Sequence, residues 1–123
     1  MNRILLIEDD VDFRWMLSEM LKREGYEVQT ADNGSEGVRL LEEEEEYDLI
    51  ITDIIMPEKE GLETIMDIMS RNPGSKVIAI SGGGRSSAGS YLKTAEYFGA
   101  VRSFQKPFDK NEFLEAVRDL VKA

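Results

Sequence analysis

The sequence contains no cysteine and no histidine among its 123 residues. Without cysteine there is neither a disulfide framework nor a thiolate metal site. Without histidine there is no histidine-based zinc site, no Ser–His–Asp triad and no histidine general base. Any chemistry must therefore use carboxylates, lysine, hydroxyl groups and the backbone.

Positive charge is also scarce, with 15 basic against 25 acidic residues and a net charge of −10. Such a surface repels nucleic acid and anionic membranes, so we expect no nucleic-acid partner. No apolar run approaches the roughly 18 residues of a membrane helix, and the apolar start leads at once into acids, unlike a signal peptide. We expect a cytoplasmic protein without membrane insertion, in which residues 1–123 form one domain with no effector domain.

Short apolar runs alternate with longer segments of helical period. Residues 4–7, 49–51 and 77–80 are continuous apolar runs, which are typical of strands buried on both faces of a parallel sheet. Residues 26–30 and 101–104 alternate between apolar and polar, as strands at the edges of a sheet do.

Apolar residues three and four positions apart predict a helix after each of these strands. The clear stripes begin at Phe13, Leu62 and Phe113, and the weaker ones begin at Val38 and Leu92. Asp109 and Glu112 are spaced as a capping box. Gly25, Gly74 and Gly99 follow three of the helices, where a left-handed C-cap is favoured.

This alternation predicts an α/β fold, a single doubly wound (βα)5 domain with helices on both faces of a parallel sheet. Three fully apolar strands belong at the centre and two alternating strands at the margins. That arrangement matches the flavodoxin-like strand order 2-1-3-4-5.

Acidic residues follow two of the predicted central strands: Glu8 and Asp9 follow the first, and Asp53 ends the third. Ligands of open parallel sheets bind beyond the carboxyl ends of the strands where the strand order reverses, here between these two strands. Carboxylates about 4 Å apart repel by roughly 4 kcal/mol at an effective dielectric of 20. We expect a divalent cation with oxygen ligands to offset this repulsion, and Mg²⁺ suits such a site. Helix capping explains Asp10 and Asp12 but not the other three acids.

The last two strands bring a hydroxyl and an ammonium group to the same edge. The fourth strand runs into Ser81 and three glycines, and the fifth runs into Lys106. A phosphoryl group on a carboxylate needs its oxygens neutralised, which Mg²⁺, Lys106 and Ser81 can share. Carboxylates are known nucleophiles in phosphoryl transfer, so this set indicates an aspartyl-phosphate site.

These residues resemble the receiver domain of two-component response regulators along the whole chain. The resemblance is carried by Ile7-Glu8-Asp9-Asp10, by Asp53-Ile54-Ile55-Met56-Pro57 with Gly61, by Ile80-Ser81-Gly82, by Gly99-Ala100 and by Lys106-Pro107-Phe108. It implies that Asp53 is the phosphoacceptor and that Asp9, Asp53 and the backbone carbonyl of Ile55 bind Mg²⁺ directly. It implies that Glu8 acts through a metal-bound water, and that Ser81 and Lys106 contact the phosphoryl oxygens.

The resemblance also implies a role and partners. The domain would signal rather than act as an enzyme, while promoting its own phosphorylation and dephosphorylation. Its donor would be a sensor histidine kinase or a phosphotransfer protein, and its output a downstream protein target. It would be a monomer or a weak dimer through the fourth helix, fifth strand and fifth helix. One position departs from the family: relatives often carry an aromatic residue where this chain has Ser103, and Phe104 lies on the opposite face.

Three other classes compete with this interpretation. An interaction module that keeps the fold without phosphorylation is the main alternative, although such a module has no reason to keep Asp53, Ser81 and Lys106 together. A haloacid-dehalogenase-type phosphatase needs a second aspartate at position 55, which is Ile55, and a longer chain. A flavodoxin-like flavin protein needs a phosphate loop rich in Ser, Thr and Gly where this chain is acidic.

Overall fold

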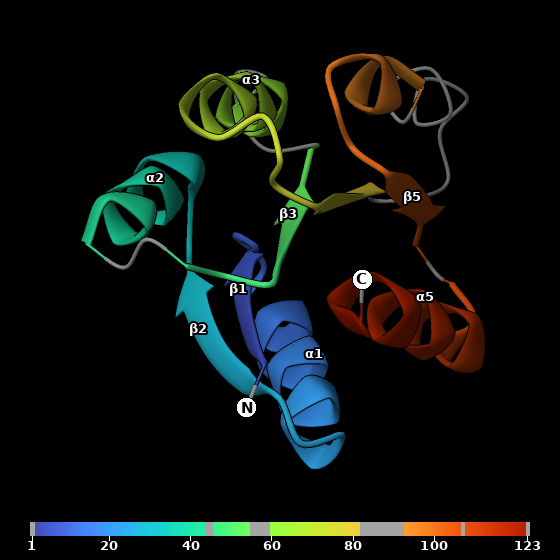
Figure 1. Ribbon diagram of the computed structural model, residues 1–123. Helices are drawn as coiled ribbons and strands as arrows, with labels where there is room; N and C mark the ends of the chain where they lie inside the picture. Colours follow the sequence, from blue (N-terminus) through green and yellow to red (C-terminus); the bar gives the residue numbers. More distant parts are fainter. Residues whose placement is uncertain (1, 44–45, 55–59, 82–92, 107, 123) are drawn as a thin grey trace.

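Five parallel strands form one sheet in the order β2-β1-β3-β4-β5 in the computed structural model (Figure 1). The structure describes residues 2–43, 46–54, 60–81, 93–106 and 108–122. The strands are β1 (Arg3–Ile7), β2 (Glu27–Ala31), β3 (Leu49–Asp53), β4 (Val77–Ser81) and β5 (Arg102–Gln105). The predicted fold class and strand order are confirmed. Both edge strands begin one residue later than predicted, because pairing with β1 and β4 sets their register.

Helices cover both faces of the sheet: α1 (Val11–Arg23), α2 (Gly34–Glu43), α3 (Glu60–Arg71) and α5 (Lys110–Lys122), with a further helical segment at residues 93–97. Figure 1 shows α2, α3 and this segment on one face, and α1 and α5 on the other. Across the ranges that the structure describes, no helix is long and apolar enough to cross a membrane.

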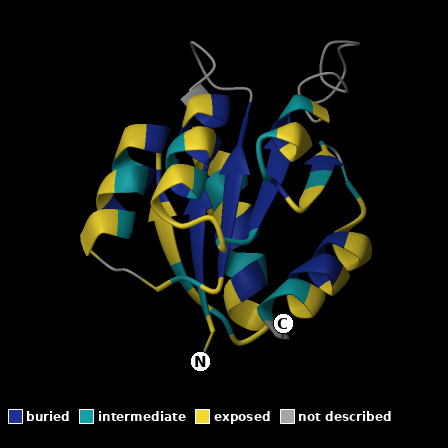
Figure 2. Ribbon diagram, turned by 45° about the horizontal axis from the view of Figure 1, so that its top comes forward, coloured by how far each residue is buried: buried dark blue, intermediate teal, exposed yellow. Residues whose placement is uncertain are grey.

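The sheet separates two hydrophobic cores. Successive residues of a strand point to opposite faces, so a strand covered on both sides must be apolar throughout. In β1, Leu5 and Ile7 belong to the core under α2 and α3, whereas Ile4 and Leu6 belong to the core under α1 and α5. All residues of β3 and β4 are buried, and β2 is mostly exposed (Figure 2). The distinction between central and edge strands is therefore confirmed.

Side-chain caps fix where the helices at the carboxyl edge begin. Asp10 Oδ1 accepts a hydrogen bond from the Phe13 amide at 3.1 Å, which makes Asp10 the N-cap of α1. At α5, Asp109 Oδ1 accepts from the Glu112 amide at 3.0 Å, as the predicted cap requires. The loop that carries Glu8 and Asp9 therefore ends at the N-cap of α1, and the loop after Lys106 ends at the cap of α5.

Two of the three predicted glycine C-caps are correct. Gly25 has φ 95° and Gly99 has φ 129°, in the left-handed region. The prediction for Gly74 is wrong, because its φ lies outside that region. The chain leaves α3 through Asn72 instead: its Oδ1 accepts from the Gly74 amide at 3.1 Å and its carbonyl accepts from the Ser75 amide at 3.0 Å.

Candidate functional site

The carboxyl ends of β1, β3 and β5 bring the predicted acidic and basic side chains to one edge of the sheet. Glu8, Asp9 and Asp53 each place a carboxylate oxygen within 4.8 Å of the others. The Lys106 Nζ donates to Glu8 Oε1 at 2.9 Å and to Asp53 Oδ2 at 3.1 Å. The structure therefore brings these four residues together as the sequence predicted.

Ser81 lies at the same edge, at the end of β4. Its carbonyl accepts from the Lys106 amide at 2.7 Å, and it is buried. The register pairs Asp53 with Ile80, so Ser81 lies one residue beyond the partner of Asp53 on the neighbouring strand. The sixth predicted site residue, Ile55, lies outside the described residues.

The Glu8 side chain contacts Lys106 and the Asp10 amide and is fixed from several sides. Its exposed fraction is 0 %, and its Oε2 accepts from the Asp10 amide at 3.1 Å. Its backbone carbonyl accepts from Arg14 Nη1 at 2.7 Å, which anchors the acidic loop to α1. Sequence reasoning missed Arg14, although an arginine on the first helix turn after an acidic loop was available as a clue.

The surroundings of Glu8 disfavour the charged form of its side chain. Burial raises the pKa of Glu8 to about 8, and the neighbouring Asp53 adds to the effect through its charge and a hydrogen bond. The Lys106 ammonium acts in the opposite direction without offsetting it. Burial lowers the pKa of Lys106, but the hydrogen bond to Glu8 and the charge of Asp53 outweigh burial and raise it. The cluster of Glu8, Asp9 and Asp53 thus holds more negative charge than the one lysine neutralises.

A hard divalent cation fits this donor set. All the converging donors are carboxylate oxygens, which Mg²⁺ prefers. Asp9 is exposed while Glu8 and Asp53 are buried, so the cluster is open to solvent on one side. In the part of the chain that the structure describes, this is the one group of three such side chains close enough to share an ion.

Gly61 allows α3 to start directly against the end of β3. A Cβ at this position would overlap the Cα of Ile54 and the carbonyl oxygen of Asp53. These are backbone atoms, which cannot move away without shifting the end of β3. Close packing beside Asp53 therefore requires glycine at position 61.

We expect Gly61→Ala to lower the free energy of unfolding by about 2 kcal/mol, because overpacked side chains displace their surroundings. Gly74→Ala is the matched control, since the nearest atom to its Cβ would be Asn72 Oδ1 at an ordinary 3.4 Å. Urea denaturation of both variants measures the difference. Equal stabilities of the two variants would contradict this account of the Gly61 contact.

The two faces of β5 differ as the sequence predicted. Phe104 is buried on the α5 side, where its ring centroid lies 5.2 Å from that of Phe113. Ser103 is half-buried, and its Oγ donates to Glu96 Oε2 at 2.5 Å. Ser103 therefore connects β5 to the helical segment at residues 93–97.

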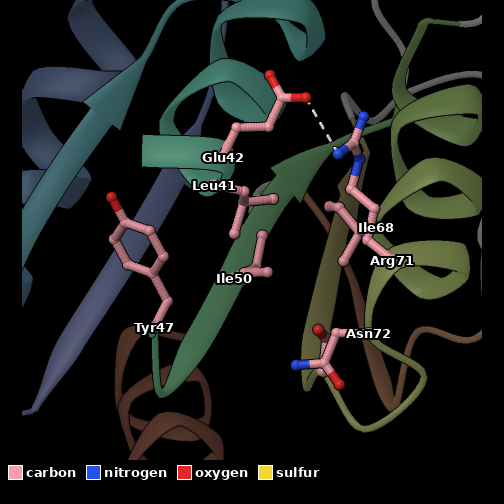
Figure 3. Close-up of a pocket in the computed structure, with 8 residues that line it drawn as sticks. Leu41, Glu42, Tyr47, Ile50, Ile68, Arg71 and Asn72 are labelled. Carbon is pink, nitrogen blue, oxygen red and sulfur yellow. Dashed lines mark ion pairs between the residues drawn. The ribbon is translucent and has the colours of Figure 1, made fainter. Parts of the chain in front are cut away.

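A cavity of about 450 Å³ lies away from this edge, between α2 and α3 (Figure 3). Leu41, Ile50 and Ile68 form its apolar part. Arg71 pairs with Glu42 at 3.1 Å and with Asp67 on its own helix, so these charges are already neutralised within the protein. We therefore assign the candidate functional site to the acidic edge of the sheet.

Residues 4–118 match the model of the family described as the response regulator receiver domain. The chain belongs to this family. CheY, a chemotaxis protein of Listeria monocytogenes, is 33 % identical to it over 99 % of this chain and 100 % of its own length. The receiver protein CpdR of Brucella abortus is 42 % identical over 67 % of this chain and 68 % of its own length.

Some relatives of this receiver domain are longer proteins. The chain spans 25 % of the transcriptional regulatory protein GlrR of Escherichia coli, with 34 % identity over 94 % of the chain. Among solved structures, TrrA of Thermotoga maritima, crystallised with Mg(2+)-BeF, is 33 % identical with a TM-score of 0.84, covering 98 % of this chain and 99 % of its own.

The family establishes the general role of the chain. Receiver domains are signalling domains of two-component systems, generally not classed as enzymes, and they interact with histidine kinases and downstream targets. They bind Mg²⁺ in an acidic pocket, and the cluster of Glu8, Asp9 and Asp53 lies at the corresponding edge of the sheet.

Proposed function

We propose that Asp53 accepts a phosphoryl group, with Mg²⁺ beside it, from a phosphohistidine of a sensor histidine kinase or a phosphotransfer protein. The observation that carries this proposal is the convergence on Asp53. Its Oδ2 lies 3.1 Å from the Lys106 ammonium, and the oxygens of Glu8 and Asp9 lie within 4.8 Å. A candidate nucleophile, candidate cation ligands and a fixed positive charge thus lie within contact distance of one another.

The residues of the chain have distinct parts in this reaction. One oxygen of Asp53 attacks phosphorus; an O–P bond forms, the N–P bond of the donor breaks, and the imidazole nitrogen keeps the electron pair. The ammonium of Lys106 and the hydroxyl of Ser81 bind the phosphoryl oxygens.

The proposed ligands of Mg²⁺ are Asp9, Asp53 and the backbone carbonyl of Ile55, with Glu8 acting through a water. When bound, the ion neutralises charge on the phosphoryl oxygens. Asp9 and Asp53 supply the oxygen donors that this ion prefers. TrrA, which was crystallised with Mg(2+)-BeF, supports the proposal as a relative of similar fold.

The proposed output is contact with a downstream protein through the helical segment at 93–97, β5 and α5, by a monomer or a weak dimer. We place the receiver in the cytoplasm, where its proposed kinase donor carries the phosphohistidine. The likeness to the chemotaxis protein CheY over the full length of that protein supports a signalling role for this domain.

Acetyl phosphate tests the proposal without a kinase. Wild-type protein incubated with this donor and Mg²⁺ is expected to gain the mass of one phosphoryl group, and EDTA is expected to prevent the gain. Asp53→Asn is expected to remain unmodified, whereas Asp32→Asn, an exposed acid after β2, is expected to behave as wild type. A mass gain that persists in Asp53→Asn would refute the assignment of the acceptor, and no gain in wild type would favour a non-phosphorylated interaction module.

A further inference from the structure

The ring of Phe13 lies over the lysine of the site. Phe13 lies on the first turn of α1, and the centroid of its ring is 4.0 Å from Lys106 Nζ. The same nitrogen contacts the two carboxylates of Glu8 and Asp53. We propose, on the basis of the function proposed above, that Phe13 is a positioning residue that holds the Lys106 ammonium in place for phosphoryl acceptance.

The position of the Phe13 ring is fixed before any ligand binds. Its amide donates to the N-cap Asp10 at 3.1 Å, which sets the backbone at the start of α1. Its ring meets Phe108 edge to face, with centroids 6.0 Å apart and an interplanar angle of 85°. Phe108 in turn stacks on Phe113 at 4.7 Å. The ring therefore belongs to an aromatic cluster of Phe13, Phe108 and Phe113 beside the site.

Lys106 needs such a partner because its other contacts change during the reaction. A lysine side chain is a flexible four-carbon stem with a point charge at its end, and this one is 18 % exposed. Glu8 and Asp53 hold it in the free protein, but these carboxylates are the groups that the cation and the phosphoryl group engage. A cation–π contact carries no formal charge, and it strengthens where water is excluded. It can hold the ammonium after the carboxylates are engaged.

Replacing Phe13 should affect the rate of modification by acetyl phosphate but not the affinity for Mg²⁺. Phe13 contacts the lysine and makes no described contact with Asp9 or Asp53, so replacing it should leave the affinity for Mg²⁺ within about twofold. The maximal rate of modification by acetyl phosphate should fall about five- to tenfold in Phe13→Leu, since the lysine is then less often in place. Phe13→Tyr keeps an aromatic face and should restore the rate.

A double-mutant cycle with Lys106→Gln tests whether Phe13 acts through the lysine. Phe13→Leu is expected to lower the rate in the wild-type background and to have no further effect in Lys106→Gln. Trp15→Leu is the control, because Trp15 is an aromatic residue of the same helix that is 67 % exposed, and its rate is expected to match wild type. An equal loss in both backgrounds, or a parallel loss of Mg²⁺ affinity, would show a general structural effect and overturn the inference.

NMR of the Lys106 side chain gives a readout that needs no phosphorylation. The Hε protons are expected to show an upfield ring-current shift that disappears in Phe13→Leu and remains in Phe13→Tyr. Absence of this shift in wild type would overturn the inference. Normal modification of wild type together with an unchanged rate in Phe13→Leu would overturn it as well while leaving the proposed function intact. A wild-type protein that takes up no phosphoryl group would overturn both.

Discussion

Lys106→Met is expected to lower the rate of modification by acetyl phosphate about 100-fold, because a fixed positive charge that stabilises the transition state is lost. The same change is expected to lower the free energy of unfolding of the metal-free protein by about 2 kcal/mol. Methionine fills much of the volume of the lysine but leaves Glu8 and Asp53 without their shared ammonium partner. The rate is measured by intact mass and the stability by urea denaturation.

The affinity for Mg²⁺ is expected to rise in Lys106→Met, whereas the rate of modification and the stability fall. Removing the Lys106 charge leaves more negative charge for the cation, so Lys106→Met should bind Mg²⁺ more tightly than wild type. Lys22→Met is the matched control, since the Lys22 side chain forms an exposed ion pair with Glu19 at 3.9 Å. This variant should match wild type in both the rate of modification and the affinity for Mg²⁺. Weaker Mg²⁺ binding in Lys106→Met, or an unchanged rate, would contradict the assigned role of this lysine.

The stability of the metal-free protein is expected to fall by on the order of 2 kcal/mol as the pH rises from about 6 to about 9. The pKa of Glu8 is about 8 in the folded protein against 4.5 for the ordinary side chain. The folded state therefore holds a proton that the unfolded state has lost, and the stability from this proton disappears as the pH rises through about 8. The pKa of Lys106 is raised, so this lysine stays protonated over this range and its contribution to the free energy of unfolding does not change.

Glu8→Gln is the control for the pH dependence. Its neutral side chain has no proton to lose, so its unfolding free energy should vary much less over the same range. Mg²⁺ at about 100 times its dissociation constant should stabilise the wild type by about 2.7 kcal/mol and should remove most of the loss at high pH. Equal pH slopes for wild type and Glu8→Gln, measured by urea denaturation in EDTA, would contradict this assignment.

The sheet was predictable because its signals are local. Short continuous apolar runs are typical of strands covered on both faces, and β3 and β4 are indeed buried at every residue. Parallel strands place their carboxyl ends at one edge, so polar residues far apart in sequence, such as Asp53 and Lys106, could be expected to meet there. Neither inference required knowledge of side-chain conformations.

The remaining features depend on side-chain direction and close packing. Phe13 was expected to be part of an apolar stripe, and nothing in its spacing shows that its ring lies over Lys106. The hydrogen bond from Arg14 to the Glu8 carbonyl depends on how α1 packs beside β1. Gly74 was assigned a left-handed conformation from its position alone, whereas Asn72 forms the turn.

Titration of ¹⁵N-labelled protein with Mg²⁺, repeated with paramagnetic Mn²⁺, tests the central claim most directly. The account predicts saturable binding, with Mn²⁺ broadening amide signals around Glu8, Asp9 and Asp53, and loss of both effects in Asp9→Asn. The chain offers an internal comparison in its run of five glutamates at residues 42–46. Broadening centred on that run, or no saturable binding at the sheet edge, would contradict the claim that these three carboxylates hold the cation beside the acceptor.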